Sequence, residues 1–275
     1  MGTLGILAGG GELPVAIAES VRESGRDLFV LALTGADDAL TAFPREDVGI
    51  GELGKSLALL KKHNCDELTL AGKVSRPEWN AIKLDARGMM ALPKVVAAAL
   101  KGDDALMRTM IGIFEKEGLR IIGTAEAAPN LIAVAGVYGR HKPDAQALAD
   151  IAQAREIVRR LGELDIGQAA AVAEGLPLAV EAAEGTDAML ERLTNLSKNL
   201  RGTPEKRRGV LVKAPKPIQE RRVDLPVIGT RTMELAAAGG LAGVAVEAGG
   251  ALLMRKSKLV ETADRLGLFV MAFEP

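Results

Sequence analysis

Short apolar runs alternate with helical patterns through the first half of the chain, and this alternation restricts the available folds more than any other feature. Strands that alternate with helices predict a parallel sheet covered on both faces. Such sheets bind ligands at the carboxyl ends of their strands, so the loops there are the first candidates for a site. The apolar runs are residues 4–8, 28–33, 67–71 and 119–122, and the helical patterns are residues 14–23, 53–62, 89–100 and 104–117.

The alternation stops near residue 129 and resumes in a different form. Two prolines, a tyrosine and a basic cluster interrupt it. We predict a first α/β domain over residues 1–128, a hinge or linker over 129–143, and a second, distinct α/β domain over 144–275. A chain of 275 residues is long enough for two modest domains. The strands expected in the second domain are 169–173, 178–182, 209–213, 243–247 and 268–272, and its helices are 144–161, 187–196, 231–238 and 258–266.

Composition excludes several classes of protein. Aromatic residues make up 3% and the formal net charge is −1, so the chain lacks the stacking rings and the basic face of a nucleic-acid-binding protein. A single cysteine, Cys65, excludes an internal disulfide framework and a cysteine-based zinc site. The stretch nearest to a membrane span, residues 236–254, is mostly Ala and Gly and contains Glu247. We expect a soluble, cytoplasmic protein.

A glycine-rich turn follows the first predicted strand. Gly9, Gly10 and Gly11 stand between this strand and the first helix, where bare backbone N–H groups bind phosphate well. Pro14 occupies a position at which the dinucleotide-binding fingerprint needs glycine or alanine, so that fingerprint is broken. The turn predicts either a phosphate or nucleotide contact or a tight connection with no ligand.

Two further segments of the first half carry polar side chains. Residues 71–77 place two cations and a hydroxyl group after the third predicted strand, where they suit a pyrophosphate. A solvated basic loop is an equally good interpretation. Asp103 and Asp104 begin a predicted helix, and a helix cap accounts for one of them. The second is a candidate ligand for a metal ion or a hydroxyl group.

The second half contains denser polar segments. Three acidic residues lie from the end of a predicted strand to the start of a predicted helix. They are Glu181, Glu184 and Asp187. Carboxylates at this density are ligands that Mg²⁺ prefers, although Thr186 or Asp187 is equally typical of a helix cap. Residues 213–226 follow another predicted strand and carry Lys, Gln, Arg and Asp on a segment with three prolines. Because proline lowers the entropy cost of holding side chains in place, we predict a functional loop there.

Methionines in the first half are spaced like helix faces. They are Met89, Met90, Met107 and Met110. Core packing explains this spacing well. The alternative is a flexible apolar surface for acyl chains.

Eight segments, in order along nearly the whole chain, carry a resemblance to a known family. They are residues 8–14, 51–55, 71–77, 101–105, 165–168, 180–189, 213–219 and 223–226. On these segments the chain resembles the LpxI-type UDP-2,3-diacylglucosamine pyrophosphatases of lipid A biosynthesis. So many matched segments are far more specific than one glycine-rich loop.

The resemblance implies an N-terminal Rossmann-like domain and a distinct C-terminal domain joined by a flexible hinge, with the lipid-bearing sugar phosphate bound between them. It implies Mg²⁺-dependent hydrolysis of the pyrophosphate to UMP and 2,3-diacylglucosamine 1-phosphate (lipid X). Water attacks the phosphorus on the sugar side. Because the substrate is a lipid, peripheral contact with the inner membrane is expected as well. The oligomeric state stays open, a homodimer included.

The resemblance also implies which residues form the site. An aspartate in the Val-Asp-Leu-Pro segment is essential in the family, and its match is Asp224. The catalytic residues expected are Asp224 and Asp187, and the Mg²⁺ ligands are these two with Glu184. The substrate-binding residues expected are Gly10, Gly11, Gly72, Lys73, Val74, Ser75, Asp103, Gln168, Thr186, Lys213 and Gln219.

Two other functions fit parts of the sequence. The first strand, glycine turn and helix are compatible with an NAD-dependent oxidoreductase, although Pro14 counts against it. The other is a non-catalytic regulator that binds a nucleotide sugar or a lipid. Such a protein would retain the phosphate-binding loops but lack the catalytic carboxylates. Asp187 and Asp224 are both present, so the sequence shows no such loss.

Overall fold

A computed structural model describes residues 2–74, 82–217, 222 and 225–275. The chain forms two compact units. The first comprises Met1–Asn130 and includes Arg222, and the second comprises Leu131–Arg221 and Leu225–Pro275. Both are α/β units, as the sequence predicts. In the described part of the chain, no helix is both long and apolar enough to cross a membrane.

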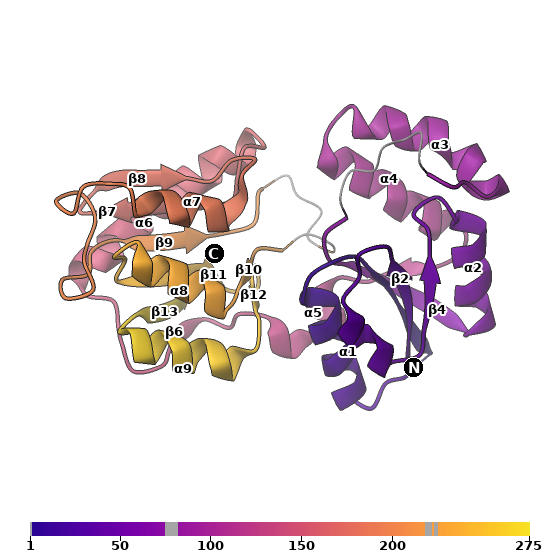
Figure 1. The fold of residues 1–275 in the computed structure, drawn as a ribbon, viewed down its shortest axis with the longest axis horizontal. Helices are drawn as coiled ribbons and strands as arrows, with labels where there is room; N and C mark the ends of the chain where they lie inside the picture. The colour runs from indigo at the N-terminus through magenta and orange to yellow at the C-terminus, as the bar shows by residue number, and fades with distance from the viewer. Residues whose placement is uncertain (1, 75–81, 218–221, 223–224) are drawn as a thin grey trace. The chain divides into compact units, whose positions relative to one another are not determined.

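The first unit is built on a parallel sheet whose described strands run in the order β3-β2-β1-β4-β5 (Figure 1). All of their pairings are parallel, as the alternation predicts. The chain moves outward from β1 to β3 and returns to the other side of β1 at β4. The loops after β1 and β4 therefore meet at the topological switch point, where doubly wound sheets bind ligands. The strands are β1 (Thr3–Ala8), β2 (Leu28–Leu33), β3 (Arg45–Val48), β4 (Cys65–Ala71) and β5 (Arg120–Ile121).

Strand β3 is absent from the sequence prediction. It contains Arg45, Glu46 and Asp47 beside a single apolar residue, Val48, so no apolar run marks it. The strand pairs with β2 at the edge of the sheet. Polar side chains are tolerated there because an edge strand is partly in water.

Helices cover both faces of this sheet. On one face α1 (Leu13–Glu23) packs on β1 and β2 and buries Ile17 and Val21 completely. On the other face Leu60 of α2 and Phe114 of α4 join Phe29 of β2 in one apolar cluster. The remaining helices of this unit are α2 (Leu53–Lys62), α3 (Ala86–Ala99), α4 (Asp103–Lys116) and the short α5 (Thr124–Ala127), with 3-10 turns η1 (Asp38–Ala42) and η3 (Pro129–Leu131).

The second unit is built on a mixed sheet whose described strands run in the order β6-β13-β11-β9-β7-β8. The three central strands β13, β11 and β9 are parallel, whereas β6 and β7 run antiparallel to their neighbours. A second small sheet pairs β10 with β12. The strands are β6 (Gly136–Tyr138), β7 (Ala169–Ala173), β8 (Leu176–Val180), β9 (Val210–Lys213), β10 (Val227–Ile228), β11 (Gly243–Glu247), β12 (Leu252–Leu253) and β13 (Phe269–Phe273).

A two-residue turn joins β7 to β8. Glu174 and Gly175 both have positive φ, +50° and +80°, which is typical of the type I′ turns that close antiparallel hairpins. The turn starts β8 at Leu176, two residues before the predicted strand, so Glu181 lies just beyond the strand end. Residues 136–138, within the stretch predicted as a linker, form edge strand β6.

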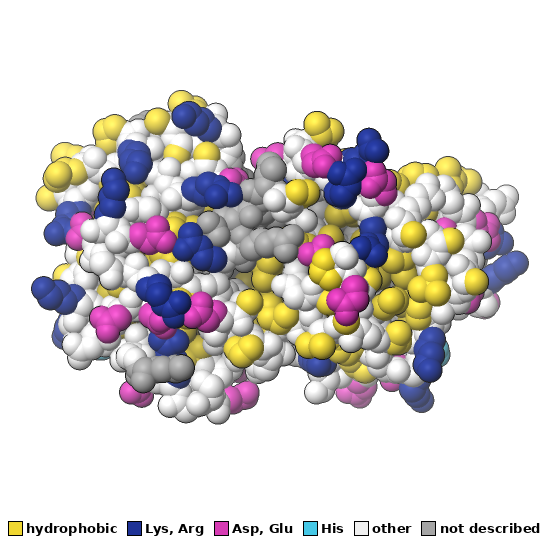
Figure 2. Space-filling model, turned by 180° about the vertical axis from the view of Figure 1, so that it is seen from behind, with side chains coloured by type: hydrophobic (Ala, Val, Ile, Leu, Met, Phe, Trp, Pro, Cys, Tyr) yellow, Lys and Arg dark blue, Asp and Glu magenta, His cyan; other side chains and the backbone are white. Residues whose placement is uncertain are grey.

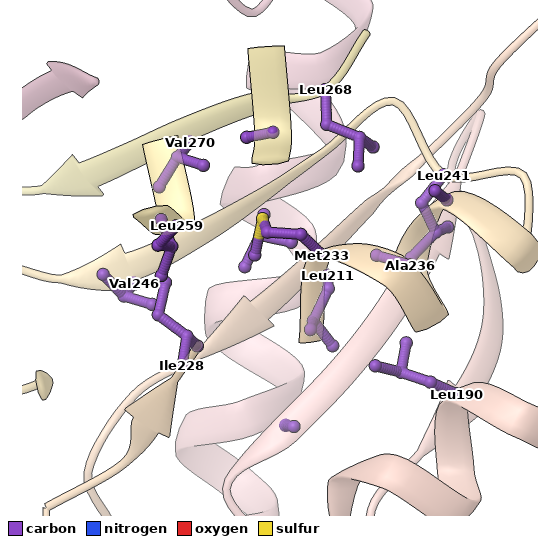
Figure 3. Packing of buried hydrophobic residues seen from close by; sticks show 14 of the residues in the cluster. Leu190, Leu211, Ile228, Met233, Ala236, Leu241, Val246, Leu259, Leu268 and Val270 are labelled. Carbon is purple, nitrogen blue, oxygen red and sulfur yellow. The ribbon is translucent and has the colours of Figure 1, made fainter. Parts of the chain in front are cut away.

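Two apolar clusters fill the two faces of the second sheet. Helix α6 (Ala145–Glu163) buries Ile151 and Val158 against one face. The other face packs against α7 (Gly185–Leu193), α8 (Thr230–Ala238) and α9 (Lys256–Leu266). Figure 3 shows Met233 of α8 and Leu259 of α9 packed near Leu211 of β9 in this cluster. Successive strand residues alternate between the clusters, as the pleat of a strand requires.

Candidate active site

The loops after β1 and β4 are hydrogen bonded to each other in the first unit. Gly10 and Lys73 form an isolated antiparallel bridge, in which each backbone N–H donates to the other residue's carbonyl oxygen at 2.8 Å. A Cβ on Gly9 would lie 2.6 Å from the Lys73 oxygen. Gly72 has a φ of +91°, and a Cβ there would meet the Gly10 oxygen at 2.8 Å. Only glycine permits this close approach.

The predicted contacts Gly10, Gly11, Gly72 and Lys73 therefore share the switch point of the first sheet. A Cβ built on Gly11 meets no atom within 4 Å, so its surroundings leave room for a ligand. Val74 is half exposed beside them. This arrangement offers backbone N–H groups near the start of α1, a favourable place for phosphate.

The acidic pair at residues 103–104 begins α4. Gly102, with a φ of +121°, occupies the cap position, and Asp103 is the first helical residue. The Asp104 carboxylate accepts from Arg108 Nε at 2.7 Å. The prediction that Asp103 binds substrate is not tested by this geometry.

In the second unit, strand direction brings together residues that are far apart in sequence. Because β7 is antiparallel to both β8 and β9, the start of β7 lies at the same edge as the ends of β8 and β9. Glu181 N donates to Ala169 O at 2.9 Å, and Ala214 N donates to Gln168 O at 3.2 Å. Gln168, Glu181 and Lys213 therefore stand side by side at this edge.

Glu181 links two of the predicted substrate-binding residues. One carboxylate oxygen accepts from the Thr186 hydroxyl at 2.7 Å and the other from the Gln168 backbone N–H at 3.1 Å. The Glu181 residue is only 6% exposed. Thr186 is thus held by a side chain and does not act as the helix cap, a position that Glu184 occupies.

Two polar groups at this edge are withdrawn from water. Lys213 is 5% exposed, and its Nζ donates to Val227 O at 3.1 Å. The side-chain oxygen of Gln168 is buried and has no hydrogen-bond partner. A buried acceptor of this kind normally has a partner, so a donor group on a ligand would satisfy it.

The predicted metal ligands Glu184 and Asp187 are each paired with an arginine. Glu184 accepts from Arg192 at 2.6 Å, and Asp187 accepts from Arg231 at 2.8 Å. The Asp187 hydrogen bond raises the pKa of Arg231. Across the described residues there is no group of three His, Cys, Asp or Glu side chains that could hold a metal ion. Glu184 and Asp187 therefore do not form a metal site by themselves.

Glu247 is an acidic residue at this edge that the sequence analysis did not propose. It ends β11, and the preceding residue Val246 pairs with Lys213 of β9. Its position beyond an apolar strand was the available signal, but only the pairing of β11 with β9 places it next to Lys213. Three predicted site residues, Ser75, Gln219 and Asp224, lie outside the described residues.

Each unit by itself carries groups that can bind a phosphate. The second has a buried ammonium group and the start of α7 at one sheet edge, and the first has a glycine-rich turn at its switch point. Cations and helix N-termini both favour phosphate oxygens.

Comparisons with known proteins agree along the whole chain. Residues 3–131 match the model of the LpxI N-terminal domain, and residues 134–271 match that of the LpxI C-terminal domain. The chain is 49% identical over 276 residues to UDP-2,3-diacylglucosamine pyrophosphatase LpxI of Caulobacter vibrioides, covering 100% of this chain and 99% of that relative.

Two solved structures share a weak likeness with the chain. CobK precorrin-6A reductase is 14% identical, with a TM-score of 0.30, over 100% of this chain and 88% of its own. N5-carboxyaminoimidazole ribonucleotide synthetase from Thermotoga maritima is 13% identical, with a TM-score of 0.25, over 80% of this chain and 57% of its own. Likeness at this level carries no argument about the fold or the activity.

Proposed function

The chain belongs to the LpxI family, and from this premise we propose that it hydrolyses the pyrophosphate bond of UDP-2,3-diacylglucosamine. The products are UMP and 2,3-diacylglucosamine 1-phosphate. The observation that carries the proposal is 49% identity, over the full length of both chains, to a relative named for this activity. Incubation of the protein with the substrate, followed by detection of both products, tests it. A protein that releases no UMP would contradict the proposal.

We propose further that water attacks the phosphorus on the sugar side. Hydrolysis in ¹⁸O-labelled water distinguishes the two phosphorus atoms, because the new oxygen stays on the one that is attacked. The label is expected in 2,3-diacylglucosamine 1-phosphate and not in UMP. Label in UMP would place the attack on the nucleoside side.

Two described residues support the proposal that a pyrophosphate is bound. Attack on phosphorus requires that the negative charge of the phosphate oxygens be neutralised and that the groups be held in line. The Lys213 ammonium group provides a positive charge at the edge of the second sheet. Gln168 can accept a hydrogen bond from a sugar hydroxyl group through its buried side-chain oxygen.

We assign to Asp224 the task of orienting the attacking water. The assignment rests on the family motif Val-Asp-Leu-Pro, which residues 223–226 match. Asp224→Ala is expected to abolish UMP release while the melting temperature stays near that of the wild type. Asp66→Ala, which alters an exposed acid of the first unit, is the control. Full activity in Asp224→Ala would contradict the assignment.

Dependence on Mg²⁺ is also a proposal. A divalent cation neutralises charge on a pyrophosphate, and Asp224, Asp187 and Glu184 are the oxygen ligands that we assign to it. Glu184 and Asp187 would first have to leave Arg192 and Arg231. EDTA is expected to stop UMP release and added Mg²⁺ to restore it. Undiminished turnover in EDTA would contradict the proposal.

We propose that α3 makes the peripheral contact with the membrane. Met89 and Met90 of this helix are 62% and 83% exposed, and Leu100, the residue that follows it, is 85% exposed. Arg87, which is paired with Glu117, and Lys94 lie on the same helix, and the helix contains no acidic residue. Figure 2 shows hydrophobic and cationic side chains together over the upper-left end of the first unit. An apolar face with cations beside it is typical of helices that lie on anionic lipid.

The two other functions that the sequence left open lose support. Both halves of the chain match LpxI domain models, and the full-length relative is named for a pyrophosphatase. UMP release in the absence of a nicotinamide would exclude the oxidoreductase. It would also exclude a regulator that binds the substrate without cleaving it.

A further inference from the structure

Glu181 is a buried carboxylate of the second unit to which the proposed function assigns no role. It stands directly after β8 and is 6% exposed. Its backbone N–H donates to Ala169 O at 2.9 Å, and a Cβ on Gly167 would lie 2.1 Å from its carbonyl oxygen. Arg192 of α7 donates to the carbonyl oxygen of the preceding residue, Val180, at 3.1 Å. The backbone of Glu181 is therefore held in place by contacts with β7, α7 and the segment before β7.

Both carboxylate oxygens of Glu181 accept hydrogen bonds. One accepts from the Thr186 hydroxyl group at 2.7 Å, and the other accepts from the Gln168 backbone N–H at 3.1 Å. Hydrogen bonds of this kind offset part of the cost of burying a carboxylate. A backbone N–H already has a fixed direction, whereas a hydroxyl proton rotates to suit its partner. Glu181 therefore restricts the hydroxyl group of Thr186 more than it restricts Gln168.

The hydrogen bond to Glu181 determines what Thr186 can offer to a ligand. A hydroxyl group has one proton to donate and two lone pairs that accept. Because the proton of Thr186 is donated to Glu181, only the lone pairs are left for a ligand. An ionised carboxylate accepts hydrogen bonds and donates none. Thr186 is therefore held as a hydrogen-bond acceptor.

Gln168 adds a second acceptor beside the same carboxylate. Its side-chain oxygen is buried and has no hydrogen-bond partner among the residues that the structure describes. Two acceptors favour a ligand that donates hydrogen bonds, whereas the oxygens of a phosphate are themselves acceptors. The positive charge that suits a phosphate belongs to Lys213, on the neighbouring strand β9. This edge of the sheet therefore has separate groups for a phosphate and for a neutral donor.

We propose that Glu181 is a positioning residue that fixes Thr186 as an acceptor, so that Thr186 and Gln168 select the acylated amino sugar of the substrate through its hydroxyl and amide N–H groups. The choice of this sugar rests on the proposed function. The requirement for a ligand that donates hydrogen bonds rests on the contacts of Glu181 itself. Glu181 acts through Thr186 and takes no part in the chemical step.

Glu181→Gln tests the proposal because it keeps the size of the side chain and reverses one hydrogen bond. The new amide oxygen can still accept from the Gln168 N–H, but the new amide N–H groups face Thr186 and take one of its lone pairs. KM for UDP-2,3-diacylglucosamine should then rise roughly tenfold. The value of kcat should stay nearly unchanged, because the contact with the sugar is the same in the ground state and the transition state. A purely structural role would instead lower the amount of folded enzyme and leave KM unchanged.

A double-mutant cycle shows whether Glu181 acts through Thr186. Thr186→Val removes the hydroxyl group and should raise KM by a similar factor. In the Thr186→Val background, Glu181→Gln should change KM by less than about threefold, because no hydroxyl group is left to orient. Two independent effects that multiply in the double variant would overturn the proposal.

The matched control is Glu163→Gln, which neutralises an exposed acid of α6 in the same unit and should leave KM unchanged. Melting temperatures show whether each variant folds. An unchanged KM in folded Glu181→Gln would overturn the proposal. If Glu181→Gln does not fold, Thr186→Val carries the test, and a wild-type KM in that variant would overturn it. None of these results affects UMP release by the wild type, so the proposed function would stand.

A wild-type protein that releases no UMP would refute the proposed function, and binding then replaces turnover in the same variants. Calorimetric titration with 2,3-diacylglucosamine 1-phosphate should show the same pattern in Kd, with each single variant weakened roughly tenfold and the double variant hardly weaker than Thr186→Val. That pattern would support the positioning role by itself. Absence of binding to the wild type, or equal affinity in wild type and Glu181→Gln, would overturn it.

Discussion

Lys213 is a cation that the fold keeps almost wholly out of water. It ends the buried strand β9, is 5% exposed, and donates to Val227 O. A pyrophosphate can add negative charge and hydrogen-bond acceptors to those that already surround a buried ammonium group. Withdrawal from water also strengthens its attraction to a phosphate oxygen, because the surrounding dielectric constant is low.

Replacement of Lys213 is therefore expected to affect catalysis strongly. Lys213→Met keeps the length and the apolar stem and removes the charge, so kcat for UMP release should fall roughly 10²–10³-fold. Lys213→Arg, which keeps the charge, should retain more activity. Activity of Lys213→Met within a few-fold of the wild type, in a folded protein, would remove Lys213 from the site.

At the scale of elements, buried carboxylates hold turns and helix ends in place. Asp150 of α6 is 1% exposed and accepts from the backbone N–H groups of Glu174 and Gly175, each at 2.9 Å. These two residues form the turn between β7 and β8. The carboxylate thus ties the hairpin to the helix, and the hairpin in turn places Glu181 beside Gln168.

Loss of the Asp150 carboxylate should destabilise the second unit. Asp150→Ala leaves two turn N–H groups without their acceptor, so the free energy of unfolding should fall by about 2–4 kcal/mol. Gln146→Ala, which removes only the side-chain donor to Asp150, is the milder control. Urea unfolding followed by circular dichroism measures both. An Asp150→Ala protein as stable as Gln146→Ala would contradict this role.

Asp85 plays a similar part for α3. It caps the helix by accepting from Gly88 N at 2.8 Å, and it also accepts from Lys55 N in α2 at 3.0 Å. Burial raises the pKa of Asp85, but hydrogen bonds from backbone N–H groups lower it more, so the pKa lies below its ordinary value of 3.8. The stabilisation is therefore complete above the unfolded-state pKa and is lost as the pH falls through the folded-state pKa.

Two substitutions distinguish the stability that comes from the helix cap from the stability that comes from the carboxylate charge. Asp85→Ala should lower the free energy of unfolding by about 1 kcal/mol at pH 7. Asp85→Asn keeps a capping side chain and removes the titration, so its stability should fall less than that of the wild type below about pH 4. Unfolding midpoints at pH 7 and pH 3.5 measure both effects. An identical pH dependence in wild type and Asp85→Asn would contradict the assignment.

At the scale of the whole molecule, the first unit has an apolar helix surface that its core does not bury. The first unit leaves half of the α3 residues exposed although the helix is rich in Met, Val, Leu and Ala. A soluble helix normally buries its apolar stripe, whereas the buried residues of α3 are Gly88 and Ala98. A lipid substrate gives a physical reason for such a face.

Vesicle binding tests this interpretation. A variant with Met89, Met90 and Leu100 changed to Ser should bind anionic phosphatidylglycerol vesicles several-fold more weakly than the wild type, because less apolar area enters the lipid. Leu164→Ser with Leu200→Ser removes exposed leucines of the second unit and is the control. Cosedimentation measures both. Equal loss in the two variants would show that α3 has no special part in membrane contact.

The sequence by itself determined most of the elements and the chemistry of several loops. Apolar runs and helical periodicity depend on neighbouring residues, so the strands of the first sheet other than β3 were predictable, and so was the glycine-rich turn at the switch point. Edge strand β3 was not, because its polar residues carry no apolar pattern. Its pairing with β2 is a long-range interaction.

Only the tertiary structure decided which polar side chains meet. Gln168, Glu181 and Lys213 are neighbours because β7 runs antiparallel to β8 and β9, a pairing that no local pattern encodes. The same holds for the bridge between Gly10 and Lys73, which forms because β4 returns to lie beside β1. Spacing along the chain shows which groups are present, whereas strand order and direction determine which of them share one ligand.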